Sequence, residues 1–253
     1  DAKEMVAALQ GAVTLEPFAV QDRAKFVGQI DKLVRTAVFG EGAKDAARWI
    51  IRMGANALGA VSASIQGLYE AIGTGKVSGF TVPAHTLRGL IYDKARALFR
   101  AAKSLDAGPF IFEIAKSEMG YCEVRPAEYS ACVLAAAIKE GWQGPVFIQG
   151  DHFQFSAKDY LKDQQKVTDE IKKLTKEAVE AGFYNIDIDS STLVVLERPT
   201  VREQQRDNYE RAAELTKFIR EIQPGEVSVG GEIGEVGKKN STVEEFEAYF
   251  HFY

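Results

Sequence analysis

Short apolar runs alternate with amphipathic stretches along most of this chain, and this alternation constrains the fold more than any other feature. Candidate strands lie at 79–84, 109–114, 145–148, 184–188 and 226–233, with helical patterns between them. One of these helices is expected over about 126–140, and a long one is expected to start at Ser156, with Asp159 as its capping partner. Strand–helix repetition of this kind requires a parallel sheet. The strand starts are 30 to 42 residues apart, which suits a (β/α)8 barrel or a doubly wound sheet.

The barrel is favoured because polar side chains follow several successive strands, and because no GxGxxG fingerprint follows the first strand. We therefore predict an α/β fold, a TIM barrel over residues 79–253 with about five of its eight βα units present. Residues 1–75 have helical spacing, with one helix expected over 24–38, so we predict an N-terminal helical extension over residues 1–78 that packs on the barrel. The missing units lead us to expect a barrel that is incomplete at its C-terminus and a chain that is part of a longer protein.

Composition excludes several classes of protein. A net charge of -5 leaves no basic excess to neutralise the phosphates of a nucleic acid. The apolar runs are too short to span a membrane, and the N-terminus does not resemble a signal peptide. With two cysteines, Cys122 and Cys132, we expect a reduced, cytoplasmic protein. We also expect a homo-oligomer.

Acids and an imidazole follow three of the candidate strands. The run at 145–148 leads to Asp151 and His152, the next strand leads to Asp189, and the fifth leads to Glu232. Because the carboxyl ends of parallel barrel strands meet at one mouth, we expect these side chains to converge. A divalent cation such as zinc, manganese or magnesium would offset the repulsion between the acids. A lone acid at a strand end is more often a cap or a surface ion pair, but four side chains at corresponding positions favour the metal site.

Four motifs in this order resemble the class II, metal-dependent fructose/tagatose-bisphosphate aldolase family, including the related barrel subunits of tagatose-bisphosphate aldolase. TVPAH at 81–85 resembles VPAFN, and GDH at 150–152 resembles the Asp-His of the third strand. IDIDSS at 186–191 resembles IDGS, and SVGGEIGEVG at 228–237 resembles VEAELGxxGG. The resemblance covers about residues 80–237.

The resemblance implies a role for each matching residue. Asp151 is the expected catalytic acid/base, and His152 is an expected ligand of a catalytic zinc or another divalent metal. Asp189 and Glu232 are expected at or near the metal. We assign Ser190 and Ser191 to substrate binding. The implied reaction is a retro-aldol cleavage of a ketose (bis)phosphate, in which a metal ion polarises the carbonyl group and stabilises an enediolate.

This chain departs from the family pattern in two places. The family uses two further histidines from later strands, whereas the other histidines here are His85 and His251. His85 is at a position that the family does not use, and His251 is in a helical pattern. Some relatives also carry a catalytic glutamate after the fifth strand, where this chain has Lys238, Lys239 and Asn240.

Three other functions remain open or are disfavoured. The chain could be a non-catalytic barrel subunit of a tagatose-bisphosphate aldolase, or a metal-dependent epimerase of a sugar or sugar acid that uses the same enediolate. A Schiff-base aldolase with Lys116 as nucleophile is disfavoured, because Glu113 and Glu118 nearby favour the protonated amine.

Overall fold

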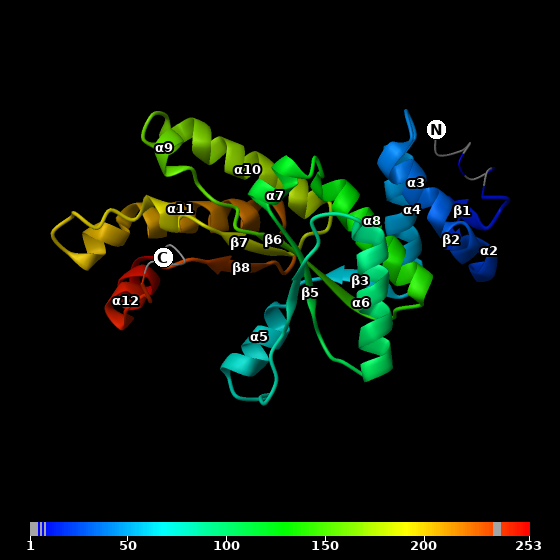
Figure 1. The fold of residues 1–253 in the computed structure, drawn as a ribbon, viewed down its shortest axis with the longest axis horizontal. Helices are drawn as coiled ribbons and strands as arrows, with labels where there is room; N and C mark the ends of the chain where they lie inside the picture. Colours follow the sequence, from blue (N-terminus) through cyan, green and yellow to red (C-terminus); the bar gives the residue numbers. More distant parts are fainter. Residues whose placement is uncertain (1–4, 6, 8, 235–238) are drawn as a thin grey trace. The chain divides into compact units, whose positions relative to one another are not determined.

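The structure is a computed structural model that describes residues 5, 7, 9–234 and 239–253 (Figure 1). It divides into two compact units, which are described separately. The first contains the described residues up to Ala63, together with Gly79–Ile148 and Ala181–Phe183. The second contains Ser64–Ser78, Gln149–Glu180 and the described residues from Tyr184 onward. The expected boundary between residues 78 and 79 stays a prediction.

The first unit begins with a hairpin that the sequence did not predict. An antiparallel pair, β1 (Val13–Leu15) and β2 (Phe18–Val20), precedes the helices α2 (Arg23–Gly28), α3 (Ile30–Phe39) and α4 (Lys44–Ala57). Strand β3 (Ala60–Ala63) follows. The expectation of a wholly helical segment is therefore wrong at these three strands, since runs of three or four residues are too short for a period to be read. The helix expected over 24–38 is divided near Gly28, a residue of low helix propensity.

Helix α8 (Pro126–Glu140) forms the centre of the first unit. Its bounds match the sequence prediction, and most of its side chains are buried. Helices α3, α4 and α6 (Ile91–Leu105) all pack against α8 (Figure 1). A salt bridge of 2.9 Å joins Arg48 of α4 to Glu128 of α8. Within this unit, the N-terminal helices thus cover a helix that follows a predicted barrel strand.

Parallel strand pairs are present in both units. In the first, β4 (Ala84–Thr86) pairs with β5 (Ile111–Ala115), and β3 pairs with the beginning of β6 (Gly144–Asp151). Helix α7 (Lys116–Tyr121) follows β5. The first barrel strand was expected at 79–84 but begins only at Ala84. Pro83 precedes it, and a proline has no N–H to donate to a neighbouring strand.

The second unit contains the end of β6, then β7 (Asn185–Ile188) and β8 (Ser228–Gly231), in parallel register. Its helical elements are α5 (Gln66–Gly73), α9 (Ala157–Tyr160), α10 (Gln164–Glu180), η1 (Ser191–Leu193), α11 (Val201–Ile222) and α12 (Val243–Phe252). The long helix expected from Ser156 is divided into α9 and α10. The predicted cap is confirmed, because the Asp159 N–H donates to the Ser156 hydroxyl, but Asp163 accepts from Lys166 N–H and starts a second helix.

The α/β class with parallel strands is confirmed, and the (β/α)8 barrel, incomplete at its C-terminus, stays a prediction. In the described part of the chain, every helix is too short or too polar to cross a membrane. Both cysteines are free thiols.

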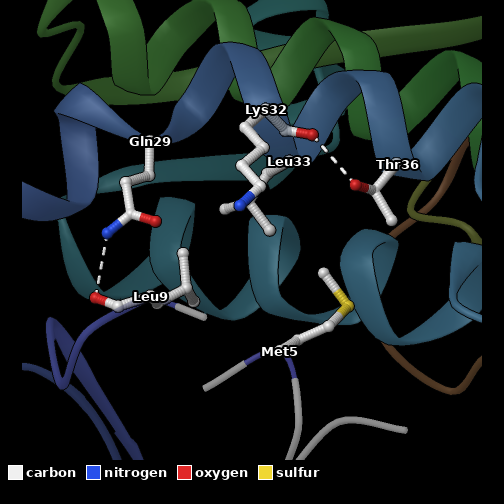
Figure 2. A pocket seen from close by; sticks show the side chains of 6 residues that line it. All are labelled: Met5, Leu9, Gln29, Lys32, Leu33 and Thr36. Carbon is white, nitrogen blue, oxygen red and sulfur yellow. Dashed lines mark hydrogen bonds between the residues drawn. The ribbon is translucent and has the colours of Figure 1, made fainter. Parts of the chain in front are cut away.

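A small cavity lies in the N-terminal region of the first unit. Figure 2 shows its lining, which comprises Met5, Leu9, Gln29, Lys32, Leu33 and Thr36. Its polar groups are used locally, since the Gln29 amide donates to the Leu9 carbonyl oxygen. At about 80 Å³ the cavity is far below the size of a sugar-phosphate site.

Gly54 of α4 lies where the N-terminal helices pack tightly against each other. A Cβ at this position of α4 would lie 2.3 Å from the ring of Phe26, which is fully buried. We expect Gly54→Ala to destabilise the protein by about 1–3 kcal/mol through overpacking, despite the higher helix propensity of alanine. Urea unfolding of the two proteins measures the difference.

Gly120→Ala in α7 is the matched control, because nothing lies within 4 Å of its added Cβ. This substitution should leave stability unchanged or raise it slightly. Equal effects of the two substitutions would contradict a tight contact between Gly54 and Phe26.

Candidate metal centre

Three parallel strands of the second unit bring their carboxyl ends together. Gly150 of β6 is in register with Ile186, and Asp187 of β7 is in register with Gly230. Because side chains alternate along a strand, Asp151, Asp187 and Glu232 lie on one face of these strands. A Cβ at position 230 would lie 3.1 Å from Asp187 Oδ1, so the glycine there leaves room for the carboxylate.

Three side chains on this face can hold one metal ion. One ligand atom each from His152, Asp187 and Glu232 lies within 4.8 Å of the others. His152 and Glu232 were both predicted as ligands from the sequence. Asp187 was not, although it lies in the same IDIDSS segment as Asp189. The signal that could have found Asp187 is the two-residue period of the strand, which places both acids on the same face.

The acids of this group are held close together and partly out of water. Burial, the neighbouring Glu232 and other acids raise the pKa of Asp187 to about 7. Burial and the negative charge of Asp189 raise the pKa of Glu232. Burial lowers the pKa of the His152 imidazole, but Asp151, Asp189 and Asp187 together outweigh burial and raise it. These shifts show that a positive charge at this point would be stabilised.

The backbone at His152 adopts a conformation that favours glycine, with a φ of 40°. The following residues hold it there. Phe153 N–H donates to the Asp187 carbonyl oxygen at 3.0 Å, and Phe155 N–H donates to that of Asp189 at 2.9 Å. The Phe153 ring lies under Gly150, where an added Cβ would come within 2.4 Å of it. This turn aims the imidazole at the acids instead of continuing the strand.

Asp189 lies behind the histidine. Its side chain is 2% exposed, and its Oδ2 lies 3.1 Å from His152 Nδ1. Its Oδ1 accepts from the hydroxyl of Ser191 at 2.6 Å and from the N–H of Ser191 at 3.2 Å. His152 Nδ1 also lies 3.9 Å from Asp187 Oδ2, and Asp189 is its nearer carboxylate. A proton on Nδ1 that is shared with Asp189 leaves the lone pair on Nε2, which is the usual arrangement of a carboxylate behind a metal-binding histidine. Direct ligation by Asp189 stays a prediction.

The donor set fits a divalent cation. One imidazole and two carboxylates are donors that zinc accepts, and carboxylates also suit manganese and magnesium. The raised pKa values of Asp187 and Glu232 show that their like charges repel without a counterion. His152, Asp187 and Glu232 are therefore the residues that would hold the metal.

The remaining predicted residues lie close to this group. Asp151 Oδ2 is 3.9 Å from His152 Nε2. The fully buried Ser190 hydroxyl lies 2.7 Å from Asn208 Oδ1 in α11 and so faces that helix. Ser191 and Thr192 line a cavity of about 510 Å³, together with Gln205, Ile233, Lys239 and others. This volume is within the range of small-molecule sites. The assignment of Ser190 and Ser191 to substrate binding stays a prediction.

Other candidates from the sequence lie outside this group. His85 is in the first unit, edge-on to Phe110, and His251 is exposed on α12 beside Phe252. Lys239 is paired with Glu245 at 3.0 Å. Lys238 and the end of the fourth motif, residues 235–237, lie outside the described residues.

Comparison with known families agrees with this geometry. Residues 68–251, more than two thirds of the chain, match the family model described as fructose-bisphosphate aldolase class-II. The chain belongs to the class II fructose-bisphosphate aldolase family. Its members are typically dependent on divalent metals, and the family places the chain among aldolase-like lyases in general. A comparison with curated proteins found no similar sequence.

Asp187 makes the stability of the metal-free protein depend on pH. Its pKa of about 7 in the folded protein lies above the ordinary value of 3.8, so the folded state binds an extra proton between these values. Stability should therefore fall as the pH rises from about 4 to 7. Asp187→Asn removes this effect and should stabilise the metal-free protein at pH 8 by at most about 4 kcal/mol, with little change at pH 4. Thermal unfolding in the presence of a chelator measures both values.

Glu226→Gln is the control, because it removes one negative charge from an exposed residue of the same unit. The stability of this variant relative to the wild type should not increase with pH. If Asp187→Asn raises the free energy of unfolding no more at pH 8 than at pH 4, the ionised Asp187 carboxylate does not destabilise the folded protein.

Proposed function

We propose that the protein is a metal-dependent aldolase that cleaves or forms a C–C bond in a ketose (bis)phosphate. The observation that carries this proposal is the convergence of His152, Asp187 and Glu232 beside Asp151, in a chain of the class II aldolase family. Family membership supports an aldolase-like lyase in general, and the substrate and metal belong to the proposal. Zinc is the first candidate, because an imidazole is among the donors.

A bound divalent cation would act as a Lewis acid on the carbonyl group of the ketose. The residues of this chain would hold that cation and move the proton. Asp151 ends β6 on the same face as Asp187, and its carboxylate is close to the imidazole without belonging to the ligand group. In the proposed reaction Asp151 takes the proton from the substrate hydroxyl. The electron pair of the breaking C–C bond then goes to the ketose fragment, which forms an enediolate and is later protonated.

The cavity of about 510 Å³ would hold the part of the substrate that does not react. Its lining begins at Ser191, the partner of Asp189, so the cavity starts next to the metal-binding group. Both the cavity and the ligand group belong to the second unit. We propose further that the protein acts in the cytoplasm as a homo-oligomer on a small sugar phosphate.

Two substitutions separate metal binding from proton transfer. Elemental analysis should find near-stoichiometric metal in the wild type and in Asp151→Asn, and little in His152→Ala. Cleavage of fructose 1,6-bisphosphate, followed through the triose phosphates released, should be lost in His152→Ala. It should fall about 10²- to 10⁴-fold in Asp151→Asn, the usual contribution of a positioned acid or base. His251→Ala and Asp169→Asn change exposed residues and should behave as the wild type.

The other outcomes each point to a different protein. Absence of metal from the wild type would reject the metal enzyme. Bound metal without turnover of any ketose phosphate would indicate the non-catalytic barrel subunit of a tagatose-bisphosphate aldolase. Inversion of a substrate carbon without release of triose phosphate would indicate an epimerase of sugars or sugar acids.

A further inference from the structure

Gln154 occupies a distinctive position beside the metal-binding group. It lies between Phe153 and Phe155, whose backbone N–H groups bond to the end of β7. Both phenylalanine side chains are buried, at 0% and 1% exposure, whereas Gln154 is exposed. The exposure of Gln154 shows that its side chain lies outside the core. It contributes little to packing there.

The amide of Gln154 bonds to the carboxylate behind His152. Its Nε2 donates to Asp189 Oδ2 at 2.5 Å. The same oxygen atom lies 3.1 Å from His152 Nδ1. The other oxygen of Asp189 is held by Ser191. Ser191 therefore holds Oδ1 of the carboxylate, and Gln154 holds Oδ2. The imidazole contacts the oxygen that Gln154 holds.

We propose that Gln154 is a positioning residue, which holds Asp189 so that His152 presents Nε2 to the metal. The inference rests on the proposed metal-binding role of His152. The chemical type of the side chain supports it, because an amide donates a hydrogen bond without adding charge. A lysine or arginine here would compete with the cation for the acids, and an apolar side chain would leave Asp189 Oδ2 with one donor fewer.

Gln154→Ala and Gln154→Met test this role. Methionine keeps the length of the side chain but has no N–H group. Both variants should bind zinc about 10- to 100-fold more weakly than the wild type in titration calorimetry, the usual effect of losing a partner behind a metal ligand. In the metal-free protein, ¹⁵N spectra of the imidazoles at a pH where His152 is neutral should show a smaller fraction of the form protonated at Nδ1. With three histidines in the chain, the His152→Ala spectrum identifies the signal.

Gln165→Ala is the matched control, since this exposed glutamine on α10 also donates to an aspartate, Asp169, at 2.9 Å. Zinc affinity and the His152 signal should be unchanged in it. Thermal unfolding is measured for both Gln154 variants and for this control, and the zinc affinities are compared at a temperature where all of them are folded. Wild-type zinc affinity together with a wild-type His152 signal in Gln154→Met would overturn the proposal, whatever the result for the alanine variant.

The same measurements distinguish failure of the proposed aldolase function from failure of the proposed role of Gln154. A wild type that binds zinc but cleaves no ketose phosphate would reject the aldolase and leave the role of Gln154 to be decided by the affinities. A wild type without zinc affinity would reject both.

Discussion

The repulsion between acids at the ends of β7 and β8 is the constraint on which the second unit depends. Parallel register brings Asp187 of β7 to the same edge as Glu232, which follows β8, and burial weakens the screening between them. Sequences that only needed to fold would not place two carboxylates there. Placing them there costs free energy, which is seen in the raised pKa of Asp187, and a bound cation would offset this cost. The local features follow from this arrangement, including the absence of a side chain at Gly230.

Two aspartates at the end of β7, Asp187 within the strand and Asp189 just after it, have different surroundings. Asp187 faces Glu232 and belongs to the ligand group. Asp189 is enclosed by the donors of Ser191, Gln154 and His152. Neutral or histidine donors surround Asp189, while Lys239, which lines the adjoining cavity, is paired with Glu245. Asp189 therefore contacts the histidine, whereas Asp187 belongs to the group that would hold the cation.

The sequence predicted the parts of this structure that have a clear local signal. Helix α8 was predicted from about Pro126 to Glu140, and these are its bounds in the structure, where Pro126 starts it and Gly141 ends it in the left-handed region. The convergence of His152 with acids from the next strands followed from strand–helix repetition alone. Sequence reasoning failed where tertiary contacts decide. The choice between Asp187 and Asp189 depends on the turn at His152, with its positive φ, and on backbone bonds from Phe153 and Phe155. No residue pattern signals these, because histidine rarely adopts that conformation without support from its neighbours.

The turn at His152 links the folding of the core to the chemistry of the site. Phe153 and Phe155 are buried while the residues before and between them, His152 and Gln154, are directed to the acids. The strain of the left-handed residue is opposed by the burial of two aromatic rings, each worth about 1.5–3 kcal/mol relative to an exposed position. Moving the backbone of His152 away from Asp189 would require this segment to leave β7, with loss of that burial. Apolar packing therefore fixes the backbone of the histidine before any metal is bound, and the contact of Nδ1 with Asp189 Oδ2 sets the orientation of the ring. A ligand whose backbone is held in this way loses less conformational entropy when the cation binds.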